Sequence, residues 1–392
     1  MNKSEASGIG LVERARALAP LLAGEADEIE RTRRLTPKVV SALIENRLYK
    51  SLLPKSIGGF ESPPTVFMEM LEEIAKADAS TAWCVGQCSV VGMTAAYLDA
   101  DVAHQIFSGP NDVAAWGAIA HAVQAVPGGY TISARWDFAS GSRQANWFGA
   151  HVQVLEADGT TRMRPNGTPE IRTIIFPASR VTMHDMWNVI GLCGTGTDSY
   201  SVENLFVPEN FAALRDDFTA LREKGPLYGI TTYSMFGLGF GAVSLGLARA
   251  TLDAAIDMAR KKHSVGLTAM KDNSAVQGLI GRTEAKLRAV RAYHFSTASN
   301  AWQEILNTGK LSEQGRAAIR LSATYTIHQS AEIVGTAYHM AGATAVFKSN
   351  PFERRFRDMH AISQQIQARD NHYEDVGKMM LTNSAIPRGP TM

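Results

Sequence analysis

Hydrophobic residues recur at helical spacing along the first part of the chain. Thr36-Pro37 supplies an N-cap and a proline at the first helical position, and the apolar positions that follow repeat as a helix requires. Residues 78–98 are apolar on nearly all sides, which predicts a buried helix. We therefore predict an N-terminal α-helical domain over residues 1–110.

The pattern changes to a period of two after Gly109-Pro110. Gly128-Gly129 is a turn, and the residues that follow it alternate between apolar and polar. The residues predicted to share one face of this strand are Tyr130, Ile132, Ala134, Trp136 and Phe138. Further strands are predicted within residues 152–154, 171–176 and 201–207. We predict a middle β-barrel or β-sandwich domain over residues 111–215.

The helical period returns after Pro226. Small residues recur between Gly237 and Ala248, which permits close contact between helices. Further helices are predicted at residues 277–306 and 314–341, and from Arg357 towards the C-terminal region. We predict a C-terminal four-helix-bundle domain over residues 216–392. The fold class is thus α+β and multidomain, in the order α, β, α.

Composition narrows the function classes. The chain has 392 residues, a formal charge of +1 and 45% hydrophobic residues, which suits a globular protein and gives no basic field for nucleic acid. Its three cysteines provide neither a disulfide framework nor a metal-ligand pattern. The N-terminus has no apolar signal core, and we find no membrane span. We expect a cytoplasmic protein that holds no metal.

Common catalytic motifs are missing from the sequence. It contains no phosphate-binding Walker loop and no Gly-x-Ser-x-Gly nucleophile turn. Gly237-x-Gly239-x-Gly241 lies inside a predicted helix, where packing explains the glycines better than a nucleotide does. One polar segment is more informative, because the alternating strand runs into Ser140-Gly141-Ser142. Hydroxyl groups and backbone amides at a strand end can bind a flat ligand with polar edges.

A second segment carries a family resemblance. Residues 187–197 read Trp-Asn-Val-Ile-Gly-Leu-Cys-Gly-Thr-Gly-Thr and precede a strand that ends Phe206-Val207-Pro208. This resembles the Gly-Thr-Gly-Ser turn of the acyl-CoA dehydrogenase superfamily. Other segments that resemble the family, in the same order, are Ile57–Phe60, Ala79–Trp83, Arg135–Gly141 and Arg357-Asp358. The resemblance covers nearly the whole chain and implies an acyl-CoA dehydrogenase-like fold.

Within that superfamily the chain looks most like the oxygenase components of two-component flavin monooxygenases. A dehydrogenase needs a carboxylate to remove a proton from a thioester substrate. The helix after Arg357-Asp358 and the glycine-rich stretch between Tyr228 and Leu252 are the family's two locations for this base, and neither has an acid at that place. The resemblance therefore implies an oxygenase, which receives reduced FMN or FAD from a separate NAD(P)H:flavin reductase and forms a C4a-hydroperoxyflavin with O₂.

The resemblance also implies the site residues. Ser140 or Ser142 matches the family's hydroxyl near the flavin N5, and a hydroxyl hydrogen-bond donor beside an aromatic wall suits the chemistry. Lys262 matches a basic position that faces the flavin phosphate, usually from a neighbouring subunit. The residues that we expect to bind the cofactor are Trp116, Gly117, Ala118, Phe138, Ser140, Ser142, Trp187, Lys262, Ala343, Thr344, Gln365 and Ile366.

The sequence departs from the family at Gln365, where many relatives that hydroxylate phenols have a histidine. Glutamine cannot act as a base at neutral pH. Two readings stay open. The substrate needs no deprotonation, as with an indole, thioether or amine, or the base is supplied by His360, which we predict to lie in the same helix as Gln365, or by His121. We take Ser140, Ser142, His360 and Gln365 as candidate catalytic residues.

The leading hypothesis is a flavin-dependent monooxygenase, and the resemblance implies that it assembles as a homotetramer. It would hydroxylate an aromatic, heteroaromatic or amine substrate. Two alternatives remain from the sequence: an acyl-CoA dehydrogenase with a displaced base, and a catalytically silent flavin-binding protein.

Overall fold

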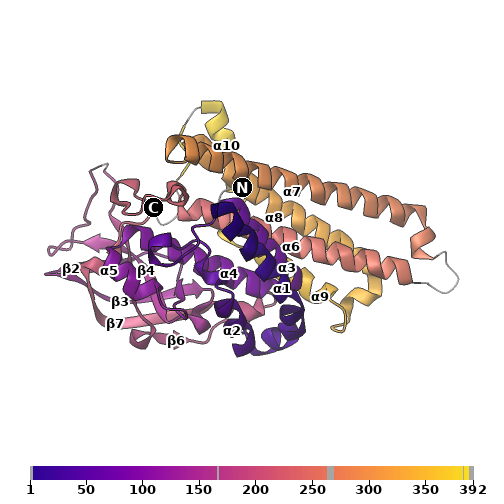
Figure 1. The fold of residues 1–392 in the computed structure, drawn as a ribbon, viewed down its shortest axis with the longest axis horizontal. Coiled ribbons are helices and arrows are strands. Elements are labelled where there is room, and N and C mark those ends of the chain that lie inside the picture. Colours follow the sequence, from indigo (N-terminus) through magenta and orange to yellow (C-terminus); the bar gives the residue numbers. More distant parts are fainter. Residues whose placement is uncertain (1–2, 166, 263–268, 383, 388–392) are drawn as a thin grey trace.

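The chain folds in three successive parts, first helical, then a sheet, then helical again (Figure 1). The computed structural model describes residues 3–165, 167–262, 269–382 and 384–387. This order of elements confirms the predicted fold class. The domain boundaries proposed from the sequence stay predictions.

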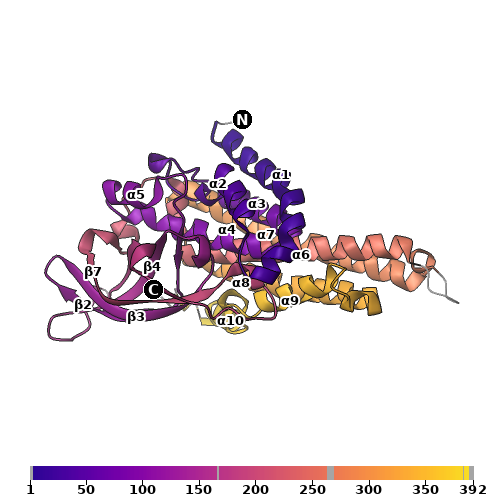
Figure 2. The same cartoon turned by 90° about the horizontal axis from the view of Figure 1, so that it is seen from below.

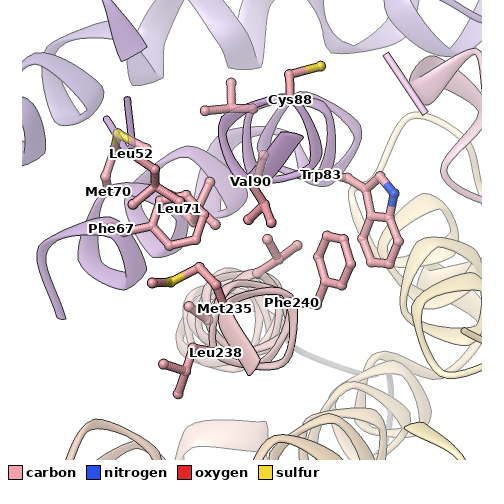
Figure 3. Packing of buried hydrophobic residues seen from close by; sticks show 14 of the residues in the cluster. Leu52, Phe67, Met70, Leu71, Trp83, Cys88, Val90, Met235, Leu238 and Phe240 are labelled. Atoms are coloured by element: carbon pink, nitrogen blue, oxygen red, sulfur yellow. The ribbon is translucent and has the colours of Figure 1, made fainter. Parts of the chain in front are cut away.

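Both helical parts contribute to one hydrophobic core. The helices of the first part are α1 (Lys3–Thr32), α2 (Pro37–Glu45), α3 (Pro64–Ala77), α4 (Ala79–Gly92) and α5 (Ala100–Phe107). Those of the last part are α6 (Thr232–Lys261), α7 (Ser274–Thr308), α8 (Glu313–Ala341), α9 (Phe352–Ile362) and α10 (Asn371–Thr382). Figure 3 shows side chains of α3, α4 and α6 meeting in this core, among them Phe67, Trp83 and Phe240. The two helical parts therefore pack as one body.

The middle part is an eight-stranded sheet with a separate core. Its strands are β1 (Ala114–Trp116), β2 (His121–Val126), β3 (Gly129–Ala139), β4 (Trp147–Leu155), β5 (Ile171–Pro177), β6 (Thr182–His184), β7 (Asp198–Pro208) and β8 (Ala212–Ala213). The order across the sheet is β6-β7-β3-β2-β4-β5-β8, and β1 pairs with β4. Trp136, Phe148 and Tyr200 are buried in its core. The long strand β3 thus lies beside β7, which follows the Thr195–Thr197 turn.

Helix α6 is buried by its neighbours. By length and composition alone it could cross a membrane, but 83% of its most apolar window is buried inside the protein. A Cβ at Gly241 would lie 2.3 Å from the His294 ring on α7, and a Cβ at Gly246 would lie 2.3 Å from the Glu72 carbonyl oxygen on α3. The predicted close contact between helices is confirmed, since only glycine fits at these two places.

Two details of the sequence prediction are wrong. Phe138 does not share the buried face with Trp136, because the β3–β7 register shifts between Trp136 and Ala139 and Phe138 adopts a φ of 65°. The bulge turns its side chain outward, and 58% of it is exposed. The last helix is also not continuous, since α9 ends at Ile362 and α10 begins only at Asn371.

Candidate active site

A chain of hydroxyl groups joins α4 to the sheet at the end of β3. The Trp83 indole N–H donates to the Ser140 hydroxyl at 3.0 Å, and the Ser140 and Thr197 oxygens lie 2.8 Å apart. Thr197 lies 2.7 Å from the Thr195 hydroxyl, which donates to the Leu192 carbonyl at 2.8 Å. The three hydroxyl groups are buried.

Hydrogen counting fixes the direction of this chain. The Thr195 hydroxyl has one hydrogen and donates it to the Leu192 carbonyl, so it must accept from Thr197. Thr197 in turn accepts from Ser140, and Ser140 accepts from the Trp83 N–H. Ser142 donates to the Gly196 carbonyl at 3.0 Å. Both serine hydrogens are therefore used inside the protein, and Ser140 keeps one acceptor lone pair.

Aromatic rings from three elements form a wall beside Ser140. The Trp83 and Phe240 rings stack with centroids 3.7 Å apart and planes 4° apart, and Figure 3 shows them facing each other. Phe236 lies one helical turn before Phe240 and stacks on it at 5.5 Å. Trp116 meets Phe236 edge-on at 6.1 Å. This wall is apolar and mostly buried, so it excludes water from the hydroxyl chain.

Trp116 is held from behind by charged and polar groups. The Arg215 guanidinium lies 5.0 Å from the centroid of the Trp116 ring, and the His151 ring meets it edge-on at 4.6 Å. Burial, together with the nearby Arg215 charge, keeps the pKa of His151 well below its ordinary value. His151 is therefore neutral and acts as a packing partner of Trp116.

An aromatic pair, the exposed Phe138 and the half-buried Trp187, lies on the outer side of the same strand end. The rings of Phe138 and Trp187 are perpendicular, with centroids 6.5 Å apart. The indole N–H of Trp187 donates to the Leu192 carbonyl at 2.9 Å. Ala118 lies beside them, since its N–H donates to the Asp137 carbonyl. Aromatic rings beside backbone groups and a hydroxyl lone pair are the surroundings that suit a flat, polar-edged ring such as a flavin.

The residues gathered at the end of β3, Trp116–Ala118, Phe138–Ser142 and Trp187, form a corner of the sheet. Leu192 connects this corner to the last helical part. Its carbonyl accepts from Trp187 and Thr195, and its N–H donates to the buried Asp358 carboxyl group on α9 at 2.6 Å. Leu192 has a φ of 52°, so these bonds hold a strained backbone conformation. Burial raises the pKa of Asp358 to about 7.

Two other carboxylates near the corner are bonded to neighbouring side chains. Asp198 pairs with the Arg143 guanidinium at 2.6 Å, and the Ser199 hydroxyl donates to Asp137 at 2.5 Å. With Asp358 bonded to Leu192, none of these three acids is free to remove a proton from a ligand. This arrangement does not suit a dehydrogenase.

The structure divides the predicted site residues into three groups. Those that it brings together at the end of β3 are Trp116, Gly117, Ala118, Phe138, Ser140, Ser142 and Trp187. Lys262 donates to the Thr344 hydroxyl at 3.0 Å and to the Ala341 carbonyl at 3.1 Å, so Lys262, Ala343 and Thr344 form a second group. It lies at the end of α6 that points away from the sheet in both views (Figures 1 and 2).

The third group follows α9. Gln365 and Ile366 lie at the 3-10 helix η12 (Ile366–Ala368), which packs against α8 and α6. The prediction that His360 shares a helix with Gln365 is wrong, because α9 ends between them; His360 is exposed, and its ring contacts Phe356. His121 instead meets the Trp136 ring edge-on at 5.5 Å. The catalytic and binding roles of all these residues stay predictions.

Several residues of this corner were not predicted from the sequence. They are Trp83, Thr195, Thr197, Phe236, Phe240 and Asp358, for which the sequence suggested family motifs or packing but no role in the site. Phe236 and Phe240 carry a usable signal, because two aromatic residues four apart in a glycine-rich helix must share one face.

Comparisons with known proteins agree with this geometry. Residues 238–369 match the family model described as acyl-CoA dehydrogenase, C-terminal domain. Indole-3-acetate monooxygenase of Pseudomonas putida is 30% identical over 366 residues, which cover 92% of this chain and 90% of that protein. The oxygenase subunit HsaA, a flavin-dependent monooxygenase of Rhodococcus jostii, is 25% identical and covers 89% of this chain and 92% of its own.

A solved structure shares the fold over almost the whole chain. XiaF from Streptomyces sp., determined in complex with FADH2 and glycerol, superposes with a TM-score of 0.90 at 20% identity, covering 99% of this chain and 98% of that chain. The fold and the corner at the end of β3 define a flavoprotein of the acyl-CoA dehydrogenase type. Within that class the chain belongs to the flavin-dependent monooxygenases, as an oxygenase component. It is an oxidoreductase, and reduced flavin is the cofactor of this family.

The Asp358 carboxyl group predicts a pH dependence of stability. Its pKa is about 7 in the folded protein and ~3.9 when unfolded, so the folded state binds more protons between these values and stability falls as pH rises through this window. Asp358→Asn keeps an acceptor for the Leu192 N–H and removes the charge. We expect the thermal midpoint of this variant, measured relative to that of the unchanged protein, to rise as the pH is raised from 5 to 8. A difference that is constant with pH would show that Asp358 does not titrate in this range.

Proposed function

We propose that this oxygenase component inserts one oxygen atom into an indole-type aromatic acid, with reduced FMN or FAD delivered by a separate reductase. When bound, reduced flavin supplies the electrons that activate O₂. The similarity to an indole-3-acetate monooxygenase over 92% of the chain supports the substrate class. The observation that carries the proposal is the corner at the end of β3, where the exposed Phe138 ring, the half-buried Trp187 ring, a hydroxyl lone pair and a dry aromatic wall meet.

The chain's own residues would hold the ring and keep water away. Phe138 offers exposed aromatic surface, and the half-buried Trp187 lies beside it. The remaining lone pair of Ser140 suits an N–H donor, such as N5 of a reduced flavin. The Trp83–Phe240 stack excludes water behind Ser140, and reactive oxygen chemistry requires this exclusion because water promotes side reactions.

The absence of a base at Gln365 fits an indole substrate. Glutamine carries no titratable proton, and His360 is exposed on another element. A phenol gains reactivity when its hydroxyl group is deprotonated, whereas the indole ring is electron-rich without losing a proton. We therefore favour a substrate that needs no deprotonation.

We further propose that several copies assemble, as a homotetramer, to complete the cofactor site. Lys262 and Thr344 bond each other at the end of α6 away from the sheet, and Val346 and Phe347 beside them are 62% and 60% exposed. A neighbouring copy could bring this basic and apolar end to the Phe138–Trp187 corner. Sedimentation analysis should find a tetramer; a monomer that binds reduced FMN with full affinity would contradict the proposal.

The function can be tested with photoreduced FMN, isotope-labelled O₂ and indole-3-acetate. We expect one labelled oxygen atom in the product, found by mass spectrometry, and little hydrogen peroxide. In the control, an acyl-CoA thioester replaces indole-3-acetate, and oxidised FMN replaces photoreduced FMN. Flavin reduction in that control without oxygenation of any aromatic compound would support the dehydrogenase alternative, and activity in neither assay would support a silent flavin-binding protein.

Ser140→Ala tests the hydroxyl chain. The change leaves the Trp83 N–H without its acceptor and Thr197 without its donor. Because a neutral hydrogen bond contributes about 0.5–1.5 kcal/mol, we expect the ratio of hydrogen peroxide to oxygenated product to rise about twofold to tenfold. Ser133→Ala, on the exposed face of the same strand, is the matched control. An equal ratio in both variants would remove Ser140 from the chemistry.

A further inference from the structure

Leu192 is a junction at which two parts of the site corner meet. Its carbonyl accepts from the Trp187 indole N–H at 2.9 Å and from the Thr195 hydroxyl at 2.8 Å, so both lone pairs are used. One branch ends at the Trp187 ring, and the other runs through Thr195 and Thr197 to Ser140. The direction of this one carbonyl therefore affects both branches.

Helix α9 holds the backbone that leads into this junction. The Arg357 guanidinium donates to the Ile190 carbonyl. A Cβ at Gly191 would lie 2.1 Å from the Arg357 carbonyl oxygen, so the two backbones are in direct contact. The Asp358 carboxyl group then accepts from the Leu192 N–H at 2.6 Å. Leu192 has a φ of 52° and a ψ of 33°, a conformation that leucine adopts only with such support, and these two angles fix its carbonyl relative to its N–H.

The Asp358 carboxyl group is buried among charged and titratable neighbours. The groups that face it from α1, α4, α9 and the turn before β7 are Glu30, Asp78, Arg354, Arg355 and Cys193. Burial is the main cause that raises the pKa of Asp358 to about 7; Asp78 and Glu30 add to the rise, whereas the Leu192 N–H and Arg354 oppose it. Asp358 therefore changes its charge near neutral pH, and only the charged form makes a charge-assisted bond with the Leu192 N–H.

We propose that Asp358 is a positioning residue for the oxygenation reaction, because its bond to the Leu192 N–H sets the carbonyl that orients both the Trp187 ring and the hydroxyl chain of Ser140. This inference rests on the proposed function of the corner as the flavin site. Asp358 acts through the Leu192 backbone. Because the charged carboxylate accepts more strongly than the neutral acid, the corner is held more firmly above neutral pH than below it.

The first test uses the full-length protein without flavin and follows the indole N–H signals by proton–nitrogen NMR from pH 5 to pH 8. Trp83 and Trp187 lie at the ends of the two branches, and Trp83→Phe and Trp187→Phe assign their signals. We expect both signals to shift with one midpoint near the pKa of Asp358, about 7, and to lose this shift in Asp358→Asn. Trp136, whose indole N–H donates to the His151 carbonyl in the sheet core, is the reference signal and should be the same in both proteins.

A second variant keeps the test decisive if Asp358→Asn does not fold. Asp78 caps α4 by accepting from the Thr81 N–H at 2.6 Å, and asparagine is an equally good cap. Asp78→Asn removes an acid that raises the pKa of Asp358, so we expect the common midpoint to move to lower pH. Asp112→Asn is the matched control, since Asp112 accepts the Gly109 N–H, also at 2.6 Å, on the loop before β1. It should leave the midpoint unchanged.

The second test measures the dissociation constant of reduced FMN for Asp358→Asn and for the unchanged protein at the same pH values. The ratio of the two constants cancels any titration of the flavin itself. We expect this ratio to rise about tenfold from pH 5 to pH 8, because the variant lacks the charge-assisted bond that the unchanged protein gains. A role in folding alone would lower the thermal midpoint of the variant without giving this pH profile.

The proposal is wrong if the indole signals keep their shift in Asp358→Asn, if Asp78→Asn leaves the midpoint in place, or if the ratio of dissociation constants does not depend on pH. Neither measurement contains the substrate. If both give the expected result and indole-3-acetate is not oxygenated, the substrate class in the proposed function is wrong and the role of Asp358 stands.

Discussion

One directed chain of hydrogen bonds holds the site corner together. It runs from the Trp83 indole through Ser140, Thr197 and Thr195 to the Leu192 carbonyl, and each donor has a single acceptor. The chain crosses from α4 to the end of β3 and on to the turn before β7. Because buried hydroxyl groups are costly when unpaired, a change at any member affects the whole series. Since Asp358 on α9 accepts from the Leu192 N–H, the geometry of the corner depends on all three parts of the fold.

The surrounding core explains why this chain can stay dry. The two helical parts share one hydrophobic core, so Trp83 on α4 can stack directly on Phe240 of α6. The sheet has its own core, centred on Trp136 and Tyr200, and meets the helical body along the strand end that carries Ser140. The site lies at this junction, where side chains from separate cores converge. Such junctions are common places for ligands because they combine rigid walls with accessible edges.

The sequence predicted the order of elements well, because periodicity and caps are local signals. It could not predict Phe138, whose outward direction depends on a bulge in the pairing of β3 with β7. It also joined His360 to Gln365 in one helix, although no proline or glycine between them marks the break. The Trp83–Phe240 stack joins residues 157 positions apart, and only tertiary packing brings them together. Motif resemblance located the serines, whereas their hydrogen-bond directions required atomic positions.

Most titratable groups around the corner are neutral or paired, and the exception is Asp358, whose pKa of about 7 lets it change charge near neutral pH. Burial, together with the Arg215 charge, keeps His151 beside Trp116 neutral. Asp198 is paired with Arg143, and Asp358 is bonded to the Leu192 N–H. A free acid or base beside an oxygen-activating flavin would offer a route for proton transfer and loss of peroxide.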